Sequence, residues 1–124
     1  IPEKFPKLRI GVFNIGVGWI PFLMERMDKD FAGRSEEETP FLKQEPSKHM
    51  TGGNWFFATT YDERSLPHVV ATIGEDHLIF GSAYPDADGL FPHAVSTLLA
   101  RRDISDQAKK KILGANAKAL FGWN

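Results

Sequence analysis

The sequence predicts an α/β fold organised around a parallel β-sheet. Three apolar runs, at residues 8–15, 54–61 and 78–82, have the length and character of buried strands. Each run is followed by a segment whose apolar residues recur with helical spacing. Because a repeated strand–helix order indicates parallel strands joined by right-handed crossovers, we expect about three βα units and a further C-terminal helix.

The first unit has a glycine-rich break between its strand and its helix. Residues 16–18 (GVG) allow a tight turn, and Pro21 suits the first turn of the helix that follows. The helix carries one apolar stripe, made of Phe22, Leu23, Met24, Met27 and Phe31. Residues 33–46 are polar and include an acidic triplet at 36–38, so we expect an exposed connection that residues 41–42 anchor.

The second unit has a clearly delimited helix at residues 66–73. Ser65 precedes it as an expected N-cap, and Gly74 follows it as the residue that ends the helix. The inward face of this helix is expected to consist of Val69, Val70 and Ile73. The third strand, at residues 78–82, follows at once.

Two helices are predicted after the third strand. The first covers residues 91–102, and the second covers residues 106–121 with Ser105 as its N-cap. The stripe of the second helix that faces the protein is expected to contain Ala108, Ile112, Ala115 and Ala119.

The composition describes one ordinary globular domain over residues 1–124. The formal charge of −1 gives no electrostatic reason to expect a nucleic acid or an anionic membrane as partner. The chain has no cysteine, which excludes disulfides and thiolate ligands and fits a reducing compartment, so we expect a cytoplasmic protein. No apolar run reaches the ~20 residues that a membrane-spanning helix needs.

A sheet of three parallel strands is incomplete by itself. Parallel sheets are covered on both faces and belong to larger doubly wound folds or barrels. Alone, such a sheet exposes an apolar strand edge that favours association. We therefore expect another polypeptide, or a stretch of chain outside residues 1–124, to complete it.

Chemically capable side chains are concentrated directly after the third strand. Ser82, Tyr84, Asp86 and Asp88 fall within seven residues. Binding and catalytic groups of α/β proteins gather at the carboxyl ends of the strands, so this loop is the first place to look for a site. Asp86 and Asp88 are also common turn residues.

Several sequence blocks together resemble one family. They are residues 6–10 (PKLRI), 16–21 (GVGWIP), 73–82 (IGEDHLIFGS), 84–85 (YP), 88–89 (DG) and 111–117 (KILGANA). In order and spacing they resemble the C-terminal part of an amidohydrolase-2 protein. These proteins are metal-dependent hydrolases and decarboxylases built on a (β/α)₈ barrel. The resemblance implies a partial (β/α)₈ (TIM) barrel, a small organic substrate and a divalent metal, for which zinc is expected.

The resemblance breaks at the family's metal-site residues. Family members typically read Ser-Asp-Tyr-Pro-His where this chain has residues 82–86 (SAYPD), so Ala83 replaces an Asp that binds the metal or handles a proton. Relatives usually carry Glu at the position of Asn14, and the family's His-x-His pair lies outside this chain. No catalytic residue is therefore intact, and the metal is expected to be bound mainly outside this chain, with Asp86 as a weak candidate ligand.

Four residues are candidates for binding the substrate: Asn14, Trp19, Tyr84 and His93. Trp19 follows the glycine turn and serves equally well as a helix-packing residue. Tyr84 can shape the loop backbone together with Pro85, and His93 suits an exposed helix start. His49, His68 and His77 have no metal-ligand spacing, so we expect structural roles for these three.

Two kinds of function remain open. The chain is either part of a hydrolase or decarboxylase whose metal ligands lie on other residues, or a non-catalytic module derived from such an enzyme. A fragment of an engineered Asp-to-Ala variant is a third alternative. We favour a small subunit of a hetero-oligomeric metal-dependent enzyme, inactive alone and associated with a barrel-completing polypeptide or a full-length homologous subunit.

Overall fold

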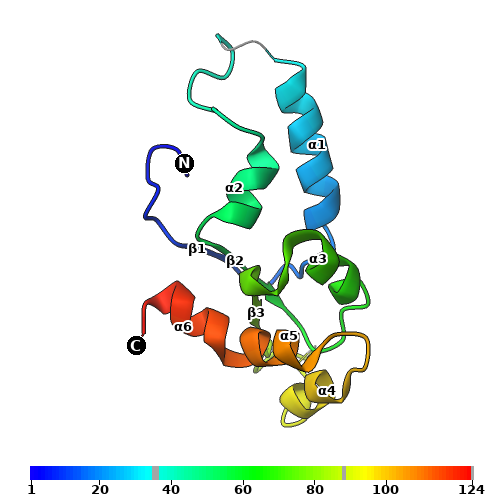
Figure 1. Ribbon diagram of the computed structural model, residues 1–124. Coiled ribbons are helices and arrows are strands. Elements are labelled where there is room, and N and C mark those ends of the chain that lie inside the picture. The colour runs from blue at the N-terminus through cyan, green and yellow to red at the C-terminus, as the bar shows by residue number, and fades with distance from the viewer. Residues whose placement is uncertain (35–36, 88, 124) are drawn as a thin grey trace.

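The computed structural model describes residues 1–34, 37–87 and 89–123. A three-stranded parallel sheet lies at its centre (Figure 1). Its strands are β1 (Ile10–Val12), β2 (Trp55–Thr59) and β3 (Leu78–Phe80), in the order β1-β2-β3. The predicted parallel arrangement is therefore confirmed, with β2 hydrogen-bonded to both neighbours.

The strands are shorter than the apolar runs that predicted them. β1 ends at Val12 because the backbone turns soon afterwards, with positive φ angles of 62° at Asn14 and 66° at Gly16. β3 ends at Phe80, three residues before Ala83, whose φ is 55°. Left-handed backbone does not continue a strand, so the polar residues beyond both strands lie in loops.

Helices α1 (Ile20–Ala32) and α3 (Leu66–Ile73) complete the two predicted crossovers. Both contain a proline in the first turn, as expected. Ser65 occupies the N-cap position of α3, but its side chain forms no capping hydrogen bond there. Gly74, with φ 81°, ends the helix, and its N–H donates to the Val70 carbonyl.

One helix was not expected from the sequence. Helix α2 (Pro46–Gly52) lies beside α1, and both extend away from the sheet (Figure 1). It begins at the proline that closes the polar connection, and Met50 is its buried residue. A seven-residue helix with one buried side chain gives almost no periodic signal, which explains why the pattern did not indicate it.

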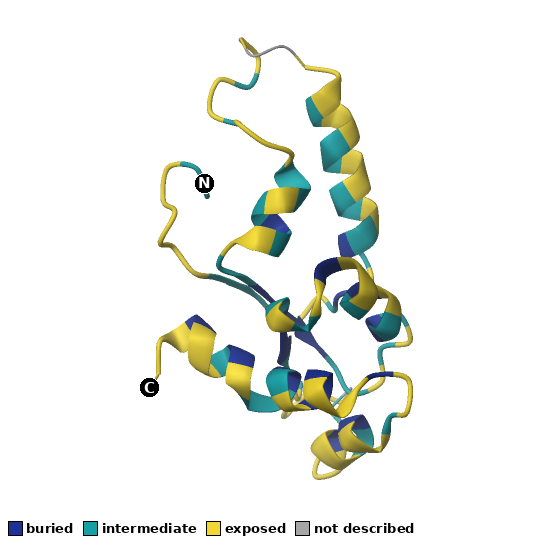
Figure 2. Cartoon of the chain, in the orientation of Figure 1, coloured by how far each residue is buried: buried dark blue, intermediate teal, exposed yellow. Residues whose placement is uncertain are grey.

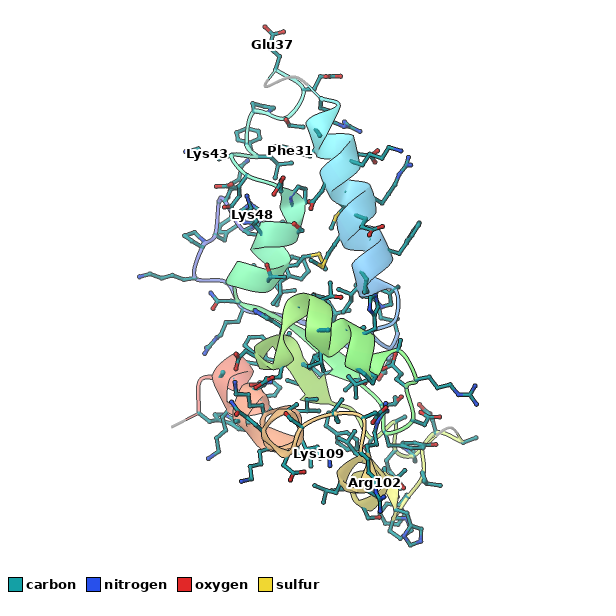
Figure 3. The ribbon with its side chains drawn as sticks, turned by 45° about the vertical axis from the view of Figure 1, so that its right-hand side comes forward. Phe31, Glu37, Lys43, Lys48, Arg102 and Lys109 are labelled. Atoms are coloured by element: carbon teal, nitrogen blue, oxygen red, sulfur yellow. The ribbon has the colours of Figure 1, made fainter. Side chains whose placement is uncertain are left out.

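The polar connection between α1 and α2 is exposed, as predicted. Figure 3 shows Glu37 at its far tip, away from the sheet. Residues 35–36, which begin the acidic stretch, lie outside the described residues. The expected anchor is half correct, because Leu42 is partly buried whereas Phe41 is 63% exposed with the Lys4 ammonium 4.2 Å from its ring centroid.

The C-terminal part is more broken than predicted. Helix α4 (Ala94–Ala100) starts three residues later than expected, after a cis Phe91–Pro92 bond. The long final helix is divided into α5 (Asp106–Lys110), a π-helical turn η2 (Lys111–Ala115) and α6 (Asn116–Phe121). Ser105 caps it as predicted, with its Oγ accepting from the Ala108 N–H at 3.0 Å.

The π turn changes which side chains of the last helix face inward. Ala108 and Ile112 are buried as predicted, but Ala115 is exposed, as is Ala119 one turn further on. The wider i→i+5 turn rotates the following residues, so that Asn116 and Leu120 take the inward positions. The predicted stripe is wrong beyond Ile112 for this reason.

Side chains alternate between the two faces of the sheet. On the helix-covered face, Phe57 and Leu78 join the main core with the apolar faces of the surrounding helices. Phe56, Ala58 and Ile79 point to the opposite face, where Leu120 is their buried neighbour. Figure 2 shows the buried residues concentrated on the strands and on the inward faces of the helices.

Two of the motif blocks that carry the family resemblance contact each other. The short 3₁₀ helix η1 (Glu75–His77) precedes β3, and Lys111 Nζ lies 3.3 Å from Glu75 Oε1 and 2.7 Å from Asp76 Oδ1. Asn116 Nδ2 donates to the Glu75 carbonyl at 2.6 Å and to the Leu78 carbonyl at 2.7 Å. These contacts fasten the C-terminal helix to the third strand, so both blocks serve the fold.

The sheet is open in the part of the chain that the structure describes. β1 and β3 each pair with β2 alone there. Leu8, Phe13 and Ile15, which flank β1, are exposed. No helix in the described ranges has the length and hydropathy to cross a membrane.

Candidate functional site

A pocket lies at the carboxyl ends of the three strands. It has a volume of about 230 Å³. Its wall is made of Asn14, Gly16, Ala58, Thr59, Thr60, Glu63, Gly81, Ala83 and Asp86. All three strand ends contribute, and Ala58 comes from the sheet face opposite the main core. This is the end of a parallel sheet where α/β proteins assemble their sites.

Two of the candidates named from the sequence, Asn14 and Asp86, meet at this pocket, together with Ala83, the position at which the family resemblance expects an Asp. Asn14 and Ala83 are the two non-glycine residues with positive φ among the described ones. Asparagine visits this conformation readily, whereas alanine gains nothing from it. Ala83 offers only a methyl group to the pocket, and Asp86 provides the exposed carboxylate there.

The loop that carries Asp86 is closed by its own backbone. The Asp86 N–H donates to the Ala83 carbonyl at 2.7 Å, and the Gly89 N–H donates to the Asp86 carbonyl at 2.9 Å. Gly89 permits this turn, since a Cβ there would meet three carbonyl oxygens at 3.0–3.1 Å. The main chain of Asp86 therefore has the turn role weighed from the sequence. Asp88 lies outside the described residues.

The other three candidates lie outside the pocket wall. Trp19 packs edge-on against Phe57 with centroids 5.9 Å apart, and its Nε1–H donates to the Gly16 carbonyl at 2.9 Å. Tyr84 is 66% exposed and packs against Phe91. His93 is exposed at the N-cap of α4. Contact of these side chains with a substrate stays a prediction.

The residue that sequence reasoning missed is Glu63. Its carboxylate lines the pocket and accepts four hydrogen bonds. Oε1 accepts from the N–H groups of Val17 at 2.6 Å and Gly18 at 3.3 Å. Oε2 accepts from the Thr59 hydroxyl at 2.7 Å and the Thr60 N–H at 3.4 Å.

A sequence signal for Glu63 exists in hindsight. An acidic residue four positions after the end of one strand can reach the free N–H groups of a glycine-rich turn after the neighbouring strand. Thr59 was missed for a related reason, because a threonine in an apolar strand suggests packing. Its side chain is fully buried and its hydroxyl is bound to Glu63.

The described residues of the pocket do not by themselves fit a divalent metal. No group of three metal-ligating side chains occurs in the described ranges. Both oxygens of Glu63 already accept hydrogen bonds from the protein, and Ala83 has no ligand atom. Asp86 is left as the one free carboxylate of the wall, and a single monodentate carboxylate falls far short of a protein metal site.

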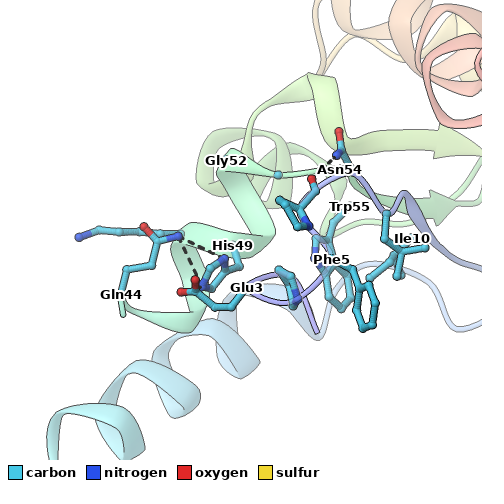
Figure 4. A pocket seen from close by; sticks show the side chains of 13 residues that line it. Glu3, Phe5, Ile10, Gln44, His49, Gly52, Asn54 and Trp55 are labelled. Atoms are coloured by element: carbon cyan, nitrogen blue, oxygen red, sulfur yellow. Dashed lines mark hydrogen bonds and ion pairs between the residues drawn. The ribbon is translucent and has the colours of Figure 1, made fainter. Parts of the chain in front are cut away.

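A second pocket of about 260 Å³ lies at the opposite, amino-terminal end of the strands (Figure 4). Phe5, Ile10 and Trp55 form its apolar side. On its polar side His49 lies 3.1 Å from the Glu3 carboxylate. Residues at this end of a barrel serve stability in characterised enzymes, so this pocket has no catalytic role in our account.

The expected structural roles of the histidines agree with their surroundings. His49 joins the N-terminal segment to α2 through Glu3, and His77 Nδ1 lies 3.0 Å from the Trp55 carbonyl. His68 is exposed on α3.

The arrangement of strands, crossover helices and strand-end pocket is that of a partial (β/α)₈ barrel. The chain belongs to the amidohydrolase family, because the sequence model of that family matches residues 1–123. Among curated proteins it is similar to 2-amino-3-carboxymuconate-6-semialdehyde decarboxylase of Dictyostelium discoideum. The two are 26% identical over 121 residues, which are 97% of this chain and 33% of the relative.

Solved structures show the same likeness. An amidohydrolase from Mycobacterium avium subsp. paratuberculosis superposes with a TM-score of 0.79 at 26% identity, over 98% of this chain and 30% of that one. A dihydroxybenzoic acid decarboxylase from a Polaromonas species was solved with manganese and the inhibitor 2-nitroresorcinol. It superposes with a TM-score of 0.72 at 25% identity, over 98% of this chain and 36% of that one.

A 5-carboxyvanillate decarboxylase from Sphingomonas paucimobilis gives a TM-score of 0.75 at 22% identity, over 98% of this chain and 36% of that one. At this identity the likeness concerns the fold. The chain thus spans about one third of the length of the relatives that it matches.

Proposed function

We propose that this chain is a small subunit of a hetero-oligomeric, metal-dependent enzyme of the amidohydrolase family that decarboxylates a small organic acid. It supplies the last three βα units of the catalytic barrel over residues 1–124, and its strand-end pocket forms one wall of the substrate site. The polypeptide that completes the barrel, or a full-length homologous subunit, supplies the remainder. This chain has an incomplete active site and is inactive alone.

The single observation that carries the proposal is the pocket at the carboxyl ends of the strands. Asn14, Ala83 and Asp86 converge there from β1 and β3, at the position where barrel enzymes hold their substrates. The open edges of β1 and β3 support completion by further strands, because an apolar parallel edge is otherwise exposed to association.

Decarboxylation is favoured over hydrolysis by the activities of the relatives. The Dictyostelium and Polaromonas proteins are both decarboxylases of small organic acids, and the second was solved with manganese. We infer that the enzyme uses a divalent metal, either manganese or the zinc expected from the family resemblance. Its ligands lie outside this chain, since the pocket wall described here lacks a sufficient donor set.

In that site this chain shapes the pocket and orients the substrate. The Asn14 amide offers both a donor and an acceptor for a polar group of the substrate. The Ala83 methyl and the Ala58 side chain provide apolar surface beside it. The secondary candidates for substrate binding are Trp19, Tyr84 and His93. Each can contact the substrate only if the completing polypeptide holds the substrate above the loop that follows β3.

The test is Ala83→Asp in the protein purified in its native assembly. Aspartate tolerates the φ of 55° at this position, so the variant is expected to fold. We expect a higher content of tightly bound divalent metal and faster release of CO₂ from aromatic and dienoic carboxylic acids. Ala87→Asp adds the same charge to an exposed position of the same loop and serves as the control.

The alternatives predict different results. If Ala83→Asp and the parent protein both lack metal and release no CO₂, this chain is a non-catalytic module and the proposal fails. If Ala83→Asp restores activity in a preparation that contains no second kind of polypeptide, the sequence corresponds to a fragment of an Asp-to-Ala variant enzyme.

A further inference from the structure

We propose that Glu63 is a positioning residue that fixes the rim of the strand-end pocket. Its carboxylate binds the turn that leads from β1 into α1 and holds this turn against the end of β2. We call the four hydrogen bonds of the Glu63 carboxylate the brace. The identity of the molecule that the pocket binds rests on the proposed function, whereas the geometry of the brace is independent of it.

The brace connects two segments that are far apart in the sequence. One carboxylate oxygen binds the N–H groups of Val17 and Gly18, and the other binds the hydroxyl of Thr59 and the N–H of Thr60. The separation along the chain is 46 residues for Val17 and 45 for Gly18. No backbone hydrogen bond of the sheet fixes the turn at this level, because β1 has already ended at Val12.

The turn after β1 has the shape needed to admit this carboxylate. A Cβ at Gly16 would lie 2.6 Å from Glu63 Oε1, and Gly16 has a φ of 66°. A Cβ at Gly18 would lie 2.7 Å from the Ser65 hydroxyl on the same side. Both glycines of the GVG segment are therefore required by what the β2–α3 loop brings against them.

The negative charge itself contributes to the brace. Val17 and Gly18 lie three and two residues before Ile20, where α1 begins, and the amino-terminal end of a helix carries a partial positive charge. Hydrogen bonds to a carboxylate are roughly twice as strong as those between neutral groups. In this protein an internal side chain thus supplies a negative charge to the turn just before the helix.

The consequence for the pocket concerns Asn14. It lies two residues before Gly16 and faces the same pocket, so movement of the turn changes the position of the Asn14 amide. Ala83 follows β3, at the other edge of the sheet from Asn14. The hydrogen bonds of the Glu63 carboxylate go to the β1–α1 turn and to the end of β2. Loss of the brace should displace Asn14 and leave Ala83 in place.

Three variants of the natively assembled protein test this: Glu63→Ala, Glu63→Gln and, as control, Glu25→Ala, which removes an exposed carboxylate on α1. We expect Glu63→Ala to lower the melting temperature by about 5–10 °C, since it deletes several charge-assisted hydrogen bonds. Sodium formate, but not an equal concentration of sodium chloride, should recover part of the loss by filling the vacated position. Glu63→Gln should lose less and should not respond to formate.

The readout specific to positioning is the amide NMR spectrum. In Glu63→Gln the Val17 and Gly18 amide signals and the Asn14 side-chain signal should shift, while the Ala83 signal stays. In Glu63→Ala formate should move the Asn14 signal back toward its parent position. Unchanged Val17, Gly18 and Asn14 signals in Glu63→Gln would overturn the proposal, even if Glu63→Ala fails to fold.

These measurements require neither metal nor turnover. A negative result would therefore leave the proposed decarboxylase function untouched. Conversely, an inactive, metal-free protein with the predicted NMR shifts would retain the brace and refute only the enzyme assignment.

Discussion

Replacing Asn116 by alanine should strongly destabilise the protein, although the residue lies outside the pocket. Asn116 is 5% exposed and donates two short hydrogen bonds, to the carbonyls of Glu75 at 2.6 Å and Leu78 at 2.7 Å. The truncation removes both bonds and leaves two acceptors without this donor. It also removes the hydrogen bonds that join the C-terminal helix to η1 and β3, while the contacts of Lys111 with Glu75 and Asp76 persist.

The expected magnitude follows from these contacts. Each hydrogen bond contributes about 0.5–1.5 kcal/mol net, and a buried acceptor left unsatisfied costs about 1–3 kcal/mol, so we expect a loss of about 2–4 kcal/mol. With a urea slope of about 2 kcal/mol per molar, the unfolding midpoint should fall by about 1–2 M.

The assay is urea unfolding followed by circular dichroism at a fixed protein concentration. The matched control is Asn54→Ala, which removes a single exposed 3.1 Å hydrogen bond to the Pro6 carbonyl and should cost less than about 1 kcal/mol. Equal effects of the two variants, or a loss below about 0.5 kcal/mol for Asn116→Ala, would refute the reasoning.

Two further predictions concern backbone shape and pH. Gly16→Ala should lower the free energy of unfolding by more than about 1 kcal/mol in thermal unfolding, because the φ of Gly16 is 66° and a Cβ there would lie 2.6 Å from Glu63 Oε1. Gly114→Ala should raise it by about 0.4–1 kcal/mol, because a Cβ at this position of the last helix meets open space. The reverse order of stability would contradict this account. The hydrogen bond from Lys111 to Asp76, followed by that to Glu75, raises the pKa of the lysine above its ordinary 10.5. The raised pKa of Lys111 therefore contributes stability that is fully present just below pH 10.5 and is lost as pH rises through the folded-state pKa, so the alkaline decline in melting temperature should be shallower in Lys111→Met.

The sequence was sufficient for the architecture because the signals were local or strictly periodic. The strand–helix alternation predicted the parallel sheet, and Ser65 and Gly74, which flank residues 66–73, predicted α3 to the residue. The motif blocks at residues 73–82 and 111–117 predicted the family, and their mutual contacts through Lys111 and Asn116 show why both are needed for folding.

The errors arose where an element is too short, or its geometry too unusual, to leave a periodic pattern of apolar residues. Helix α2 is too short to show a period, and its single buried residue is Met50. The π turn at Lys111–Ala115 shifts the inward face of the last helix, and no pattern of apolar residues distinguishes such a turn from an ordinary one.

The sequence predicted one part of the candidate site and missed another. Asn14, Ala83 and Asp86 follow strands that lie in one sheet, so their convergence at one edge follows from topology. Glu63 was missed because its hydrogen-bond partners in the β1–α1 turn are 45 and 46 residues away in the sequence. Trp19 packs against Phe57, a contact that spacing along the chain cannot indicate.

The most direct test of the central claim is native mass spectrometry of the purified protein, with metal content determined on the same preparation. Our account predicts a complex that contains this chain, a second and longer chain, and a bound divalent metal ion. A metal-free assembly of this chain alone would contradict it and would leave a binding or structural module with the fold of an enzyme.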